Sequence, residues 1–60
     1  MKRTTFDIIT TKLNYWFSNV EEDLQNGIIT PYEAQELRTE LLTGKEILNM
    51  VVELEGIEKE

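Results

Sequence analysis

Residues 23–34 have the sequence Asp-Leu-Gln-Asn-Gly-Ile-Ile-Thr-Pro-Tyr-Glu-Ala, in which one helix is predicted to end and another to begin. Gly27 can adopt a positive φ without steric cost, so it suits the position just after a helix that ends near Asn26. Thr30, Pro31 and Glu33 then fit the N-cap, first and third positions of the next helix, which together form a capping box. The stretch therefore predicts a tight joint between two helices.

Upstream of this joint, apolar residues recur at alternating spacings of three and four. This period is typical of one face of a helix, and it predicts a first helix over about residues 5–25. We expect the stripe to serve as core or as an oligomer contact. Its members are Phe6, Ile9, Leu13, Trp16 and Val20, with Phe17 at its border.

Downstream, a second helix is predicted over about residues 31–42 and a third over about residues 45–56. Thr43 and Glu46 repeat the capping-box spacing, and Gly44 weakens a continuous helix by about 1 kcal/mol. Ile47, Val51 and Leu54 give the third helix its apolar face. A short strand over residues 50–54 is the alternative, because its β-branched residues lower helix propensity.

The predicted fold is therefore all-α: a helical hairpin plus a third helix, forming one domain over residues 1–60. A 60-residue domain buries only about 60% of its extended surface. The chain has no Cys and no His, so neither a disulfide nor a Cys/His zinc site can stabilise it. We expect the small bundle to be completed by oligomerisation, most simply as a dimer.

Charge is distributed unevenly along the sequence. Residues 1–20 carry three bases against one acid, a balance of +2, whereas residues 21–60 carry three bases against eleven acids, a balance of −8. Such a surface repels phosphate, so nucleic acid is not an expected partner. No apolar run approaches the roughly 20 residues of a membrane span, and no secretory leader is visible, so we expect a cytoplasmic protein without a membrane partner.

The segment at residues 20–42 resembles the SHOCT domain, a short helical module common in bacterial and phage proteins. Two departures are the Ala34 that stands where an aromatic residue is usual, and the position of the motif in mid-chain. The resemblance implies a helical interaction or oligomerisation element and carries over no catalytic residue. The matching positions are Leu24, Gly27, Ile28, Ile29, Thr30, Glu33, Arg38, Leu41 and Leu42.

The joint also has features of a calcium-binding EF-hand loop, with Gly27 at loop position 6 and Glu33 at position 12. Leu24 would then occupy position 3, where an oxygen ligand is needed, so a capped hairpin without metal is the favoured interpretation. An enzyme is not expected either, because the chain lacks His and Cys and is too short to enclose a pocket that shifts a carboxyl pKa. No cofactor is predicted.

The predicted function is therefore protein–protein interaction, as a small acidic adaptor or inhibitor of bacterial or phage type that binds a larger protein. Acids near the end of the first helix oppose the helix dipole, which suggests that a basic partner keeps them there. Exposed aromatics favour interfaces. The candidate partner-binding residues are Tyr15, Glu21, Glu22, Asp23 and Tyr32. Two alternatives remain open: an acidic DNA mimic that blocks a DNA-binding protein, and a structural oligomerisation element.

Overall fold

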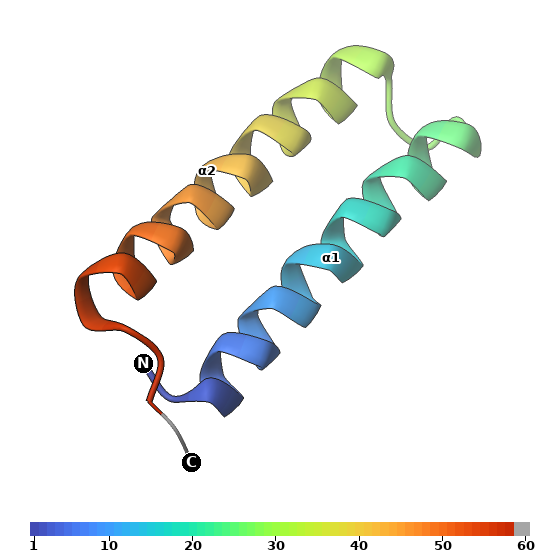
Figure 1. The fold of residues 1–60 in the computed structure, drawn as a ribbon. Coiled ribbons are helices and arrows are strands. Elements are labelled where there is room, and N and C mark those ends of the chain that lie inside the picture. The colour runs from blue at the N-terminus through green and yellow to red at the C-terminus, as the bar shows by residue number, and fades with distance from the viewer. Residues whose placement is uncertain (59–60) are drawn as a thin grey trace.

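The computed structural model describes residues 1–58 and shows two long antiparallel helices (Figure 1). Helix α1 spans Arg3–Gln25 and helix α2 spans Pro31–Glu55. Over the described residues the chain is thus all-α and a helical hairpin, as the sequence predicts. The Cα atoms extend over 42 × 18 × 8 Å, so the two helices form a single layer.

The end of α1 has the predicted geometry. Gly27 has a φ of 71°, and no other heavy atom beyond its chain neighbours lies within 4 Å of the position that a Cβ would occupy. The Gly27 amide donates to the Leu24 carbonyl, and the Ile28 amide donates to the Asp23 carbonyl. These two hydrogen bonds are those of a Schellman motif, which satisfies carbonyls that the helix end leaves free.

The start of α2 is the predicted capping box. The Glu33 amide donates to Oγ1 of Thr30 at 3.1 Å, and the Thr30 amide donates to Oε1 of Glu33 at 3.2 Å. Pro31 occupies the first helical position, where its missing N–H costs nothing. Local chemistry alone thus fixes the turn between the helices.

The predicted third helix is wrong, because α2 continues from Pro31 to Glu55 without a break at residues 43–46. Thr43 does not act as an N-cap: its hydroxyl donates to the Thr39 carbonyl, one helical turn earlier, at 3.0 Å. Gly44 faces α1, and a Cβ there would lie 3.7 Å from Cδ2 of Leu13. Because residues 50–54 are helical as well, the strand alternative is excluded.

The core of the hairpin is small. The buried hydrophobic residues are Leu13 and Val20 from α1, and Ala34 and Leu48 from α2. Leu13 and Val20 lie seven residues apart, and Ala34 and Leu48 lie fourteen apart with Leu41 midway. This heptad spacing keeps one seam of each helix against the other.

The ends of the described chain meet at the open end of the hairpin (Figure 1). The Met1 amino group donates to the Gly56 carbonyl at 2.9 Å, and the Glu58 amide donates to the Met1 carbonyl at 2.8 Å. Gly56 ends α2 with a φ of 72°. These contacts hold the first residues of α1 beside the last turn of α2.

Candidate interaction surfaces

The acidic residues are concentrated in the half of the hairpin that contains the turn, which we call the joint half (residues 14–44). It holds six acids and one base, a balance of −5, out of −6 for the whole chain. The base, Arg38, is paired with the carboxylate of Glu21 across the two helices. The remaining five acids leave the joint half strongly negative, while the open half is close to neutral.

The five predicted partner-binding residues all lie in the joint half, but the structure spreads them over several sides of it. Tyr15 and Glu22 are exposed and, at seven residues apart, share one side of α1. Glu21 is engaged with Arg38, and Asp23 is half-buried. Whether these residues bind a partner remains a prediction.

The fifth of them, Tyr32, is 72% exposed at the start of α2. Its side chain borders a shallow hollow of about 400 Å³ that Glu36 and Glu40 also line. Ile28, at the tip of the turn, is 68% exposed. The joint half thus combines negative charge with accessible apolar groups.

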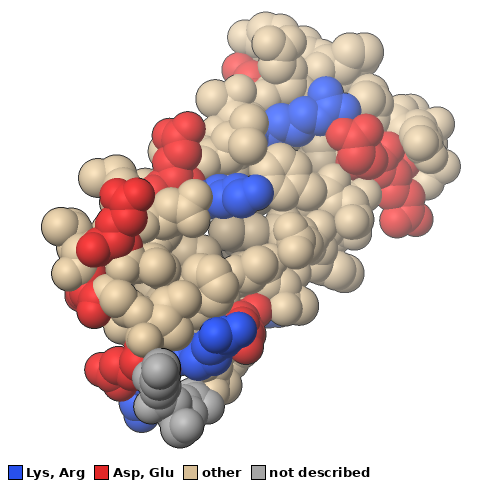
Figure 2. All heavy atoms as spheres, in the orientation of Figure 1, with Lys and Arg blue, Asp and Glu red and all other residues tan. Residues whose placement is uncertain are grey.

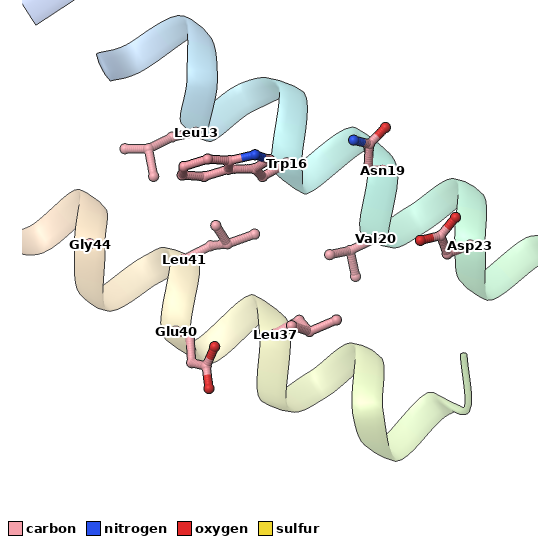
Figure 3. Close-up of a pocket in the computed structure, with 9 residues that line it drawn as sticks. All are labelled: Leu13, Trp16, Asn19, Val20, Asp23, Leu37, Glu40, Leu41 and Gly44. Carbon is pink, nitrogen blue, oxygen red and sulfur yellow. The ribbon is translucent and has the colours of Figure 1, made fainter. Parts of the chain in front are cut away.

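A second surface is an apolar groove between the helices (Figure 3). Trp16 and Leu41 point into the space between α1 and α2, and Gly44 leaves the α2 wall without a side chain. Glu40 points away from α1. The groove has a volume of about 410 Å³, and its lining residues are Leu13, Trp16, Asn19, Val20, Asp23, Leu37, Glu40, Leu41 and Gly44.

The other side of the contact line has a different character. Phe17 and Lys45 each follow a groove residue by one position, so they flank the contact line from the opposite side. They border a smaller hollow of about 200 Å³. On the face shown in Figure 2, most basic side chains lie along the middle of the molecule and most acidic ones lie toward its edges.

The residues predicted as core or oligomer contacts divide between two locations. Leu13 and Val20 are buried between the helices, with Phe6 and Phe17 half-buried beside them. The remaining members are not core in the hairpin: Trp16, Ile47 and Leu54 are exposed, and Ile9 and Val51 are half-buried.

Two core residues, Ala34 and Leu48, were absent from that predicted set. Ala34, Leu41 and Leu48 recur at intervals of seven, a signal that the assumed break at residues 43–46 obscured.

Among the described residues, no group of three or more His, Cys, Asp or Glu residues is placed to hold a metal ion. The Glu33 carboxylate accepts a hydrogen bond from the Thr30 amide in the helix cap. In residues 1–58 neither helix has the length and apolar content required to cross a bilayer.

Comparison with known proteins gives no independent identification. No family model, curated protein or solved structure matches the sequence. The resemblance of residues 20–42 to the SHOCT domain therefore has no support beyond the residues that suggest it.

Proposed function

We propose that the chain is a non-enzymatic protein–protein interaction module, whose acidic joint half docks on a basic surface of a larger protein as an adaptor or inhibitor. The observation that carries this proposal is the concentration of a −5 balance within residues 14–44. Such a charged end steers association toward a basic partner and raises the rate of encounter.

Exposed side chains at the same end supply the contact area that charge alone does not. Tyr32 and Ile28 are among the exposed large side chains, and both lie at the turn or within the first turn of α2. Tyrosine is enriched among the residues that dominate binding energy in protein interfaces. We therefore place the docking surface at the turn, with Tyr32 near its centre and Glu22 and Glu36 at its edges.

The test is a capture experiment with the full chain as bait in a lysate of the source cell, followed by affinity measurement with the captured protein. The variant Glu22→Lys/Glu36→Lys reverses two charges in the joint half. The variant Glu46→Lys/Glu53→Lys makes the same change of charge in the open half. We expect at least tenfold weaker binding for the first variant and less than twofold for the second.

Equal weakening by both variants would show that only overall charge matters and would contradict a defined docking end. Unchanged affinity in both would place the interface elsewhere. Competition of the captured protein between this chain and duplex DNA would favour the DNA-mimic alternative, in which the acids replace phosphates. Raising the salt concentration should weaken the complex, as charge-driven association does.

A further inference from the structure

The hairpin exposes more surface than a compact protein of its mass. Its accessible area is 4851 Å² for 7.0 kDa. Folded monomers of this mass expose roughly 4,000 Å² by the usual scaling, so the excess is about 800 Å². That excess equals what one partner buries in a protein interface of standard size, about 800 Å².

The reason for the excess is architectural. Helices in globular domains bury their apolar stripes between at least two layers, whereas this hairpin is one layer thick. Leu13 and Val20 are buried within that layer, but Trp16 remains 49% exposed beside them. The hairpin therefore has a second apolar face with nothing packed on it among the described residues.

That face runs beyond the groove toward the open end. On α2, Gly44 is followed by Ile47, Val51 and Leu54 at spacings of three and four, which keeps them on one side of the helix. On α1, Ile9 precedes Trp16 by seven residues and lies on the same side. We call this surface the second seam; its residues are Ile9, Trp16, Leu37, Gly44, Ile47, Val51 and Leu54.

We propose that the second seam binds a second copy of this chain, so that two hairpins pack face to face as a four-helix bundle. A second copy supplies an identical apolar face of the same length. Its near-neutral open half also lets the apolar residues of the open end approach without repulsion. Three seam residues, Trp16, Leu37 and Gly44, fall within residues 14–44, but none of them is among the residues placed at the docking surface. Either proposal can therefore fail without the other.

The chain carries its own probe of this contact. Trp16 is its single tryptophan, and it is half-exposed in one hairpin. Sedimentation should give about 14 kDa, and dilution should convert this species to 7 kDa. The tryptophan emission should shift to longer wavelength over the same concentration range, because Trp16 returns to water.

Matched variants locate the contact on α2. Ile47 is 55% exposed and lies on the second seam, whereas Leu42 is 51% exposed and, five positions earlier, points to the opposite side of the helix. We expect Ile47→Ala to raise the dimer dissociation constant at least tenfold and Leu42→Ala to raise it less than twofold. If single hairpins unfold when they separate, the thermal midpoint instead rises with concentration and falls more for Ile47→Ala than for Leu42→Ala.

A 7 kDa species at every concentration up to about 200 μM would overturn the proposal, since packing of a standard-size interface should be visible well below that. Equal weakening by the two variants, or no weakening by Ile47→Ala, would also overturn it, because the copies would then meet on another surface.

Discussion

The continuity of α2 can be tested with two separate variants, each of which replaces one threonine of the chain with alanine. Thr30→Ala removes the hydroxyl that caps α2, where Oγ1 accepts from the Glu33 amide at 3.1 Å. Loss of an N-cap threonine costs about 1 kcal/mol. Thr43→Ala removes a hydroxyl that only adds a second donor to a carbonyl within the helix. Because alanine has the higher helix propensity, this change should stabilise the chain by about 0.5 kcal/mol.

The two variants should therefore move stability in opposite directions. For a 60-residue chain, 1 kcal/mol corresponds to roughly 4–8 °C in the thermal midpoint. We expect Thr30→Ala to melt about 4–8 °C lower than the parent and Thr43→Ala about 2–4 °C higher. Helical circular dichroism recorded at one fixed protein concentration measures both, because dimerisation makes the midpoint concentration-dependent. If Thr43→Ala lowers the midpoint as much as Thr30→Ala does, Thr43 is a helix cap and the unbroken α2 is refuted.

Three further predictions concern the turn and the contact between the helices. Gly27→Ala should cost about 1–2 kcal/mol of unfolding free energy from the backbone alone, because φ is 71° and the Cβ meets nothing within 4 Å; an unchanged urea midpoint would contradict this turn. Leu48→Ala should lower the free energy of unfolding by about 2–5 kcal/mol because the side chain is buried, whereas Leu42→Ala, at an exposed position, should lower it by less than about 1 kcal/mol. Equal effects would mean that α2 packs a different face against α1. Glu21→Gln should cost less than about 1 kcal/mol, since its pair with Arg38 is partly exposed, and the difference from the parent should shrink in about 1 M salt if it is electrostatic.

The turn could be predicted from sequence because every interaction that defines it is local. Gly27, Thr30, Pro31 and Glu33 lie within seven positions, and their roles depend on backbone geometry rather than on distant partners. The predicted break at residues 43–46 was wrong because local preferences did not decide the structure there. Thr43, Gly44 and Glu46 have the same local preferences, but the packing of α2 along the whole of α1 overrides them. Leu48, buried against α1, lies beyond the supposed break.

The interaction surfaces were less predictable, because a heptad stripe does not determine which other surface its residues pack against. Spacings of three and four place Ile9, Leu13 and Trp16 on one broad face of α1. Only the position of α2 decides that Leu13 is buried within the hairpin while Trp16 stays half-exposed. The −5 balance of residues 14–44 can be counted from the sequence, but only the hairpin shows that these residues form one half of the molecule.

The single joint also bears on how the chain folds. Contacts across the hairpin join residues that lie further apart in the sequence the further they are from the turn. Glu21 and Arg38 are separated by 17 positions, and Met1 and Gly56 by 55. Closing the longer loop costs about 1 kcal/mol more chain entropy than closing the shorter one. Contacts between the helices should therefore form first near the turn and later toward the open end. The folding transition state should be structured around residues 20–38. Substitutions near the turn should then slow folding, and substitutions in the last turns of α2 should chiefly accelerate unfolding.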